Sequence, residues 1–493
     1  MIEYQLSFSR EHQINKLADN TDFELLVIGG GVVGAAALEM ASNSGIKTLL
    51  VEKNDFSSGA SSRSTKLLHG GIRYLPQMQF GLVRESLQEQ KKLEELIGGL
   101  YKPLNLLAPI FKDDGFADLP KIFQNNFIAP KAFKAGLSFY DFLGLRNKEK
   151  RHISISKEEI YKNFPLLKKE NLSKGFLFND AQTDDAKLVL TILRNAVEIN
   201  KSLAVNYLEV IEIKNNIDNF TVTIVDKIYN EKYLITTKKI IAATGVHTLP
   251  KEYKFKSSKM RFSGGAHIVL KGDPLGLNNK GVLLPKTEDK RIMFVLPWLN
   301  NTIVGTTDTE DFSGTLDNPF ANKKDIEYLV RHVKKYFSIN NVDYISSWSG
   351  VRALIGKDST SSKNVSRGHY VNNIDKNFIQ VAGGKLTGFR SIAKESLESL
   401  FNKSFEMKKL EFIDDLIKIQ DEYQSDELET CIKHYSVAKP LDYMLRRSHL
   451  SWFNEEGGKA SLNAISEHFS NKNDILEETL NELRAEGLTE INN

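Results

Sequence analysis

The sequence predicts an α/β protein that combines a βαβ unit near the N-terminus, a mostly antiparallel sheet in its second half and a helical C-terminal region. The βαβ unit is indicated by an apolar strand at 25–28, a glycine-rich turn, an alanine-rich helix at 35–44 and a second apolar strand at 48–53. Closely spaced strand-like segments between 260 and 307 indicate the antiparallel sheet. The segment 411–493 is charged and reads as a small helical domain.

The turn of the βαβ unit has glycines at the spacing of a dinucleotide fingerprint. Gly29 permits the tight turn, Gly31 lets a pyrophosphate approach the backbone, and Gly34 lets helix and strand pack closely. The helix N-terminus offers free N–H groups and a partial positive charge to the phosphates. Glu52 ends the second strand, where it can accept both ribose hydroxyls of an adenosine and would repel a 2′-phosphate. The pattern therefore favours FAD or NAD over NADP.

Two simpler interpretations of this stretch are a membrane span and an ordinary buried βα unit. Residues 25–46 are long enough to span a bilayer. However, they include Glu39, four glycines in their first ten residues and the polar residues 42–44. An ordinary βα unit does not need three glycines at this spacing. The succession of strand, turn, helix, strand and acid favours dinucleotide binding.

Composition limits the class of protein. A chain of 493 residues is long enough for two or three domains, and 41% hydrophobic with 26% charged residues is typical of a soluble globular protein. The net charge of +3 is too balanced to indicate a nucleic-acid partner. The single cysteine, Cys431, excludes an internal disulfide and a zinc site of several cysteines, and no metal site is predicted. Residues 1–22 lack an apolar core, so no secretory peptide is expected.

The remaining periodicity predicts further elements in chain order. They are a serine- and glycine-rich loop at 54–75, helices at 81–97, 130–144 and 186–199, strands at 203–213, 220–225 and 239–245, a helix at 322–338, a strand at 378–382 and a helix at 386–402. Asp184 and Asp185 look like capping and first-turn acids of the helix at 186–199, which is a structural role. The strand–glycine–helix unit at 378–402 is interpreted as a return to the nucleotide domain.

The densest polar loop is 61–75, which reads Ser-Ser-Arg-Ser-Thr-Lys-Leu-Leu-His-Gly-Gly-Ile-Arg-Tyr-Leu. Its hydroxyls and paired glycines suit a loop that runs along a cofactor. His69 can exchange a proton near neutral pH, and Arg73 can fork onto a phosphate or carboxylate. A single histidine is more often a surface or core residue, but the setting of His69 favours a site.

The loop resembles the signature of FAD-dependent glycerol-3-phosphate dehydrogenases. Further segments match that family in the expected order: Tyr140–Gly144, Asp184–Leu190, Arg291–Trp298, Gly305–Asp308, Ser349–Arg352, Gly383–Thr387 and Leu441–Arg447. The similarity runs from about residue 22 to about 460, and the motifs separate this family from the wider D-amino-acid and glycine oxidase superfamily. Two positions depart from the pattern, Phe389 where tyrosine is expected and Ala353 where proline is expected.

The resemblance implies a Rossmann-like FAD-binding domain with an antiparallel-sheet cap (substrate) domain. The FAD-binding domain would be assembled from 22–105, 181–255 and 349–405, and the cap domain from 106–180 and 256–348, before the helical domain at 411–493. The flavin's reactive ring would lie between the two domains.

Residue by residue, the resemblance implies a cofactor site and a substrate site. The cofactor residues are Gly29, Gly31, Gly34 and Glu52 for the ADP half, Ser61, Ser62, Lys66 and His69 along the rest, Gly245 in its glycine turn, and Gly384, Lys385 and Thr387 near the pyrimidine end. The substrate residues are Arg73 and Arg352 for a phosphate, with Lys385, Tyr74, Arg261 and His267 as further contacts. Lys385 would stabilise reduced flavin. The catalytic base would be His267 or His69, with a slight preference for His267.

The implied reaction is oxidation of sn-glycerol 3-phosphate to dihydroxyacetone phosphate by hydride transfer from C2 to flavin N5. Electrons would pass to a membrane quinone, because the short C-terminal domain argues mildly against the longer oxidases of the family. The alternatives are an oxidase that forms hydrogen peroxide from oxygen, an amine or amino-acid oxidase, and a flavin-binding protein without turnover.

The expected location is the cytoplasm, with peripheral contact at the inner face of the cytoplasmic membrane as a weaker expectation. The basic and aromatic stretch 121–142 can lie in a membrane interface or pack against its own domain. A homodimer is compatible with the sequence, and a nucleic-acid partner is not expected.

Overall fold

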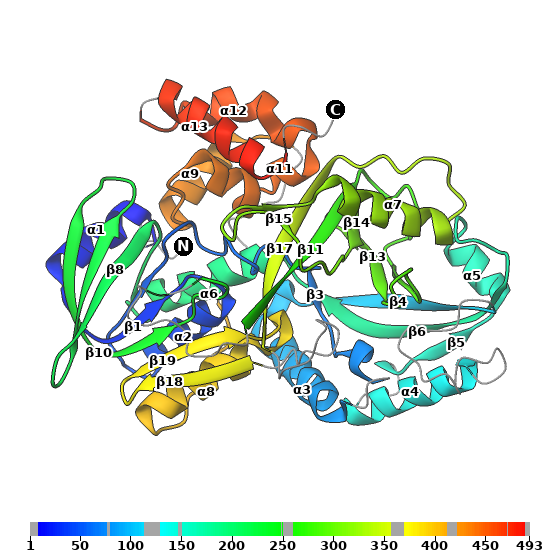
Figure 1. The fold of residues 1–493 in the computed structure, drawn as a ribbon, viewed down its shortest axis with the longest axis horizontal. Helices are drawn as coiled ribbons and strands as arrows, with labels where there is room; N and C mark the ends of the chain where they lie inside the picture. Colours follow the sequence, from blue (N-terminus) through cyan, green and yellow to red (C-terminus); the bar gives the residue numbers. More distant parts are fainter. Residues whose placement is uncertain are drawn as a thin grey trace.

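Two β-sheets lie side by side in the computed structural model, with the C-terminal helices above them (Figure 1). The structure describes residues 8–75, 79–112, 129–145, 150–247, 249, 260–355, 369–411, 422–470 and 472–488. The predicted fold class is confirmed. The structure has one sheet with parallel strands at its centre, a second sheet that is mostly antiparallel, and helices at the C-terminal end of the chain.

The first sheet has parallel strands at its centre, in the order β18-β19-β10-β1-β2-β7. Its strands are β1 (Asp22–Ile28), β2 (Thr48–Val51), β7 (Leu203–Val205), β8 (Leu208–Asn215), β9 (Phe220–Asp226), β10 (Lys232–Ala242), β18 (His369–Asp375) and β19 (Phe378–Gly383). β1 pairs in parallel with both β2 and β10, while β8 and β9 extend the sheet in antiparallel fashion. Helices α2 (Val32–Asn43), α6 (Asp185–Glu198) and α8 (Phe389–Phe401) pack together beside it.

The turn from β1 into α2 depends on two glycines. Gly29 has a φ of +113°, and a Cβ there would lie 2.5 Å from the carbonyl oxygen of Ala243 at the end of β10. A Cβ on Gly34 would lie 2.0 Å from the Gly29 carbonyl oxygen. Both contacts are with backbone, which cannot move aside, so this close approach of strand and helix requires glycine.

The second sheet is mostly antiparallel and runs β17-β11-β14-β13-β12-β4-β6-β3, with β5 beside β6. Its strands are β3 (Leu67–Leu68), β4 (Lys102–Phe111), β5 (Ile153–Ile155), β6 (Leu172–Gln182), β11 (Met260–Leu270), β12 (Gly281–Leu284), β13 (Met293–Trp298), β14 (Asn301–Gly305) and β17 (Ser346–Ile355). The predicted strands between 260 and 307 are all present. β4, β6 and β17 were not predicted, and the domain boundaries expected at 105/106 and 348/349 fall inside β4 and β17.

Four of the predicted helices, those expected from 81, 130, 186 and 322, begin within one residue of the expected position. The helix expected from residue 35 begins earlier, at Val32, and the short helix Lys157–Asn163 was not predicted. Asp184 caps α6 by accepting the amide of Lys187, and Asn322 caps α7 (Lys323–Tyr336) by accepting the amide of Asp325. The remaining helices beside the sheets are α1 (Arg10–Asp19), α3 (Phe80–Leu96), α4 (Ala129–Leu143) and α5 (Lys157–Asn163). The helix predicted from residue 386 opens with the 3₁₀ turn η7 (Leu386–Gly388) before α8.

The C-terminal region is helical, as predicted, and it shares a hydrophobic core with the first sheet. Its elements are α9 (Ser425–His434), α10 (Pro440–Asp442), the π-helical turn η8 (Tyr443–Arg447), α11 (Leu450–Phe453), α12 (Lys459–Ser466) and α13 (Lys472–Ala485). Buried residues from these helices belong to the same apolar cluster as those of β1 and α2. Asp55, in the loop after β2, is paired in the interior with Arg446 and Arg447 of η8. The helices are thus an integral part of the fold.

The first prediction concerns this buried charge cluster. Asp55→Asn leaves Arg446 and Arg447 undercompensated in the interior, which should cost about 3–5 kcal/mol and lower the thermal unfolding midpoint. Burial by itself would raise the pKa of Asp55, but Arg447 and Arg446 outweigh it and lower the pKa. Stabilisation by Asp55 is therefore complete above the unfolded pKa of about 4 and is lost as the pH falls below it.

Asp218→Asn is the matched control, because Asp218 is exposed in a turn between β8 and β9. It should change stability by less than about 0.5 kcal/mol. Calorimetry of both variants from neutral pH down to pH 3 measures the effect. Equal unfolding midpoints for the two variants at neutral pH would refute the assignment.

Candidate functional site

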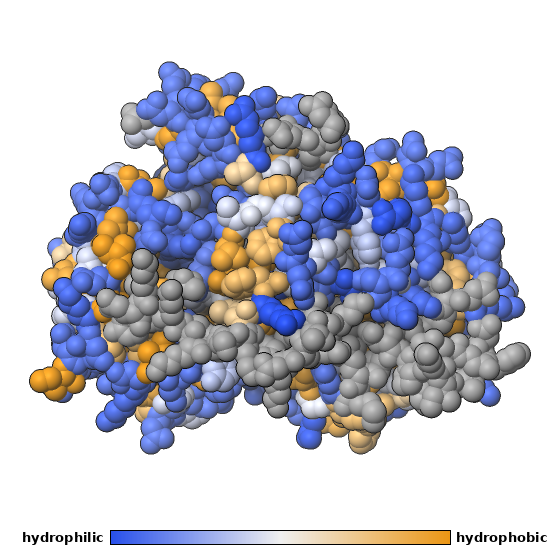
Figure 2. All heavy atoms as spheres, in the orientation of Figure 1, coloured by the Kyte–Doolittle hydropathy of each residue, from blue (hydrophilic) through white to orange (hydrophobic). Residues whose placement is uncertain are grey.

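A cavity of about 350 Å³ lies where the first sheet meets the second. It is bordered by the turns that follow β1 and β10, by the end of β19, by β17 and by the loop 58–74. Figure 2 shows hydrophobic atoms gathered in the centre of the face where β17 lies in Figure 1. Open parallel sheets bind ligands beyond the carboxyl ends of their strands, and this cavity lies at that edge.

One end of the cavity suits a pyrophosphate. Gly31 precedes α2, and the Ser61 hydroxyl accepts the amide of Val32 in its first turn at 3.0 Å. The first turn of α2 contains no acidic residue of its own, which favours an anion at this end of the helix. A Cβ at Gly245 would meet no atom within 4 Å, which leaves open space beside the cavity. The residues present therefore fit the diphosphate of a dinucleotide.

Glu52 lies at the same end with its carboxylate fixed. Its two oxygens accept the backbone amides of Gly30 at 2.7 Å and Asn54 at 2.9 Å. Burial raises the pKa of Glu52, against the lowering effect of those two hydrogen bonds. Each oxygen retains a lone pair, so the side chain can still accept ribose hydroxyls from the cavity it borders.

Asp317 also borders this end of the cavity, and no local pattern in the sequence indicated it. It lies in the turn between the short strands β15 (Ser313–Gly314) and β16 (Pro319–Phe320). Its Oδ1 lies 2.7 Å from Lys53 Nζ and accepts Asn54 Nδ2 at 3.0 Å. His247 Nε2 is 3.4 Å from the same oxygen. These contacts hold the β15–β16 hairpin against Lys53 and Asn54, the two residues that follow Glu52.

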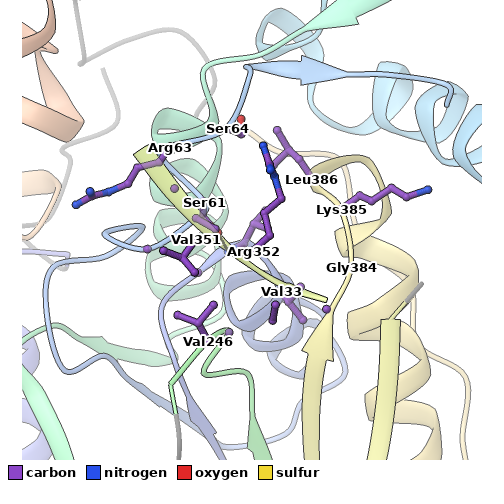
Figure 3. A pocket seen from close by; sticks show the side chains of 18 of the residues that line it. Val33, Ser61, Arg63, Ser64, Val246, Val351, Arg352, Gly384, Lys385 and Leu386 are labelled. Carbon is purple, nitrogen blue, oxygen red and sulfur yellow. Dashed lines mark hydrogen bonds between the residues drawn. The ribbon is translucent and has the colours of Figure 1, made fainter. Parts of the chain in front are cut away.

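The opposite end of the cavity contains cations. Arg352 Nη2 donates to Thr306 Oγ1 at 2.8 Å, and a Cβ on Gly265 would lie 2.1 Å from that nitrogen. Lys385 Nζ lies 4.0 Å from the centre of the Tyr74 ring, a cation–π contact. Figure 3 shows Arg352 extending toward Leu386 and Ser64, while Lys385 and Arg63 extend to opposite sides.

His267 lies behind this end. Its ring is 1% exposed and stacks on Trp348 with 5.1 Å between ring centres. Nε2 is 2.9 Å from the Thr65 hydroxyl oxygen. Burial, followed by the charges of Arg352 and Lys66, lowers the pKa of His267 well below its usual value. The ring is therefore neutral at physiological pH and can accept a proton.

Most of the residues predicted from the sequence are brought together at the cavity. The predicted residues that border it are Gly29, Gly31, Glu52, Ser61, His69, Tyr74, Gly245, Arg352, Gly384 and Lys385. The predicted residues absent from its lining are Gly34, Ser62, Lys66, Arg261, His267 and Thr387. Arg73 lies in the short turn η1 (Ile72–Tyr74), and its side chain is outside the described part of the structure.

The residues away from the cavity have identifiable structural partners. Lys66 does not extend along a cofactor, because its buried ammonium pairs with Asp185 at 2.6 Å and donates to the Ser62 carbonyl at 2.7 Å. Thr387 instead donates to the His69 carbonyl at 3.2 Å and so holds that loop. Arg261 is exposed, 3.9 Å from Glu310. Within the described residues, no group of three or more histidines, cysteines or acids is arranged to hold a metal ion.

Comparison with known proteins identifies relatives. Residues 24–391 match the family model described as FAD dependent oxidoreductase. The chain is 34% identical over 413 residues to the mitochondrial glycerol-3-phosphate dehydrogenase of Bos taurus, covering 79% of this chain and 54% of the relative. It is 33% identical over 402 residues to the aerobic glycerol-3-phosphate dehydrogenase of Staphylococcus aureus (strain MRSA252), covering 80% of this chain and 69% of the relative. The match thus spans about half the length of the mammalian protein.

A solved structure is similar over nearly the whole chain. The glycerol-3-phosphate dehydrogenase from Bacillus halodurans, complexed with FAD, has a TM-score of 0.72 and 25% identity, with 98% of each chain covered. This coverage includes the C-terminal helices.

The second prediction concerns the hairpin at the adenosine end. Asp317→Asn removes the ion pair with Lys53 and should weaken FAD binding by roughly two- to fivefold, because a half-exposed pair contributes about 0.5–1 kcal/mol. Fluorescence titration of the apoprotein with FAD measures the dissociation constant. Asp311→Asn, an exposed acid that precedes the same hairpin, is the control. If both variants bound FAD as tightly as the wild type, the hairpin would have no role in retention.

Proposed function

The chain belongs to the FAD-dependent oxidoreductase family, among the glycerol-3-phosphate dehydrogenases, and on that premise we propose that it oxidises sn-glycerol 3-phosphate to dihydroxyacetone phosphate. Its cofactor is FAD. One observation carries the proposal: a single cavity joins a dinucleotide end, at Gly31 and Glu52, to a cationic end, at Arg352 and Lys385.

The cationic end suits a phosphorylated substrate. A phosphate dianion in a partly desolvated pocket needs more than one positive group, and a guanidinium can bind two of its oxygens. Arg352 is partly exposed at the cavity, and its contacts with Thr306 and with Asp308, 3.7 Å away, orient the side chain. We assign the phosphate to Arg352, with Arg73 as the second arginine implied by the sequence resemblance.

The reaction needs a base within hydrogen-bond reach of the substrate's C2 hydroxyl, directly or through a relay. When bound, FAD accepts the hydride that leaves C2 of the substrate. The C2 hydroxyl must lose its proton at the same time, and a positioned base contributes about 10²- to 10⁴-fold to such a step. His69 borders the cavity directly, whereas the neutral ring of His267 reaches it through Thr65. We retain both as candidate bases, with preference for His267.

The third prediction tests substrate binding. Arg352→Gln should raise KM for sn-glycerol 3-phosphate by roughly 10- to 100-fold, because a charged hydrogen bond contributes about 1.5–3 kcal/mol. Turnover at saturation should fall less. The control is Arg331→Gln, on the exposed face of α7. It removes one positive charge, as Arg352→Gln does, and should leave KM unaltered. Steady-state kinetics of the two variants and the wild type provide the comparison.

Anaerobic mixing of the FAD-loaded protein with sn-glycerol 3-phosphate tests the function itself. The yellow flavin absorbance should bleach, and glycerol or glycine should leave it unchanged. A flavin that stayed oxidised with the phosphorylated alcohol would overturn the proposed function.

We propose a quinone as the electron acceptor, and the alternative is oxygen. An oxidase would release hydrogen peroxide in proportion to substrate consumed. The two are separated by measuring peroxide with and without a soluble quinone analogue. Peroxide formation that matches turnover in the absence of the quinone would replace our proposal with the oxidase.

We also propose peripheral contact with a membrane through α4. Leu137 and Tyr140 pack into the core on one face of this helix, as expected for a helix against its own domain. On the other face, Phe139 is 37% exposed and Phe142 is 70% exposed. Exposed lysines at 131 and 134 lie on the same helix, and residues 121–128 of the predicted stretch are outside the described residues. Among the described helices, none has the length and apolar character needed to cross a bilayer.

The fourth prediction follows from this exposed aromatic face. The double variant Phe139→Ser with Phe142→Ser should bind liposomes rich in anionic lipid several-fold less than the wild type, because it removes two apolar anchors while both lysines remain. Ile217→Ser is the control, since Ile217 is fully exposed on a hairpin far along the chain. Co-sedimentation measures binding. Equal sedimentation of the double variant and the wild type would exclude α4 as the contact.

A further inference from the structure

Thr65 separates His267 from the cavity. Thr65 borders the cavity, whereas His267 is not among the residues that line it, and Thr65 Oγ1 lies 2.9 Å from His267 Nε2. Building on the function proposed above, we propose that Thr65 is a catalytic residue whose hydroxyl relays the proton of the substrate's C2 hydroxyl to His267. His267 then acts on the substrate without contacting it.

The residues on either side of Thr65 hold it in place. The Ser64 amide and hydroxyl both donate to Asp185 Oδ2, at 3.1 and 2.6 Å. The Lys66 amide donates to the Ser64 hydroxyl oxygen at 2.9 Å, and the buried Lys66 ammonium pairs with Asp185. The Thr183 amide donates to the Lys66 carbonyl at 2.9 Å. The backbone on both sides of Thr65 is thus held by Asp185, the first residue of α6, and by Thr183, just before that helix.

The ring of His267 is held in an orientation that suits the relay. It stacks nearly parallel on Trp348, at 18°, and a Cβ on Gly305 would overlap the ring at 2.1 Å from Cδ2. The absence of a side chain at Gly305 therefore makes room for the imidazole. With Nε2 directed at Thr65, the neutral ring can accept the hydroxyl proton in the tautomer that carries its own proton on Nδ1.

The charges around the ring favour its neutral form. Two cations face it, Arg352 from β17 and Lys66 from the loop before β3, and each has an acidic neighbour, Asp308 and Asp185 respectively. Burial and the two cations lower the pKa of His267, while the Gly265 carbonyl acts in the opposite direction. The same cations favour rapid release of a proton once the ring has accepted one.

The step conserves protons and electrons. The C2–H bond breaks, and its electron pair leaves with the hydrogen as a hydride. The oxidant that would take up this hydride is FAD, the cofactor of the family. The C2 O–H bond breaks and its proton passes to Thr65 Oγ1 while the Thr65 proton passes to His267 Nε2. A carbonyl forms at C2, Thr65 ends as the neutral alcohol, and His267 ends as an imidazolium that later returns its proton to solvent.

The decisive variant is Thr65→Val, which keeps the shape of the side chain and removes the hydroxyl. It should reduce the rate of anaerobic flavin bleaching by about 10²-fold, as expected for loss of proton transfer, with FAD affinity unchanged. Thr65→Ser restores a hydroxyl and should recover the rate to within a few-fold of wild type. The Thr65→Val, His267→Gln double variant should be no slower than the slower single variant, because both substitutions break one relay.

A second readout does not depend on turnover. In protein labelled with ¹⁵N-histidine, the His267 signals are those lost in His267→Gln. Without substrate, Thr65→Val should shift the Nε2 resonance, and Thr65→Ser should leave it near its original position. An unchanged resonance in Thr65→Val would show that the hydrogen bond does not exist in solution and would overturn the relay.

The remaining outcomes identify which proposal fails. A bleaching rate in Thr65→Val equal to wild type, with His69→Gln strongly impaired, would refute the relay and make His69 the direct base. Additive losses in the double variant would likewise refute it. If the wild type itself failed to bleach, the proposed function would fall, and the relay would fall with it. The wild-type control alone therefore separates failure of the proposed function from failure of the relay.

Discussion

The contact between the backbone of Gly34 and the carbonyl of Gly29 is the constraint on which the cofactor end of the site depends. At this approach a Cβ would lie 2.0 Å from an oxygen that cannot move, so no other residue allows α2 to start so close to β1. The same turn is packed against Ala243 on its other side, so the end of β10 is placed at the same edge. The positive end of α2, Glu52 and the turn at Gly245 therefore face one cavity.

Buried charges extend this arrangement to the C-terminal helices. Burial by itself would raise the pKa of Asp184, yet His449 and Lys66 outweigh it and lower the pKa well below its usual value. His449 Nε2 lies 2.6 Å from Asp184 Oδ2, and Arg63 pairs with Glu486 at 2.6 Å beside the loop that borders the cavity. Buried ion pairs are weak sources of net stability because of desolvation. His449 directly precedes α11 and Glu486 directly follows α13, so these pairs join the C-terminal region to the cap of α6 and to Arg63, which borders the cavity.

Local patterns predicted the parts of the fold that local interactions determine. The glycine turn and the helices expected from 186 and 322 are all present, because each depends on residues within a few positions. β17 was not predicted, because Ser346–Ile355 alternates poorly and becomes a strand through pairing with β11. The partner of Lys66 was missed for the same reason, since Asp185 is 119 positions away. Asp317 likewise acquires its position only when the hairpin meets Lys53.

For the phosphorylated substrate that we propose, the placement of His267 also solves an electrostatic problem. A dianion beside an imidazole favours the protonated ring, and a protonated ring cannot act as a base. A histidine that touched the phosphate would therefore lose the property that the reaction requires. His267 is instead buried among Trp348, Arg352 and Lys66, where its neutral form is favoured, and it meets the cavity only through the uncharged hydroxyl of Thr65. In the proposed reaction Arg352 binds the anion, while burial, which is the largest cause of the lowered pKa of His267, keeps the ring unprotonated.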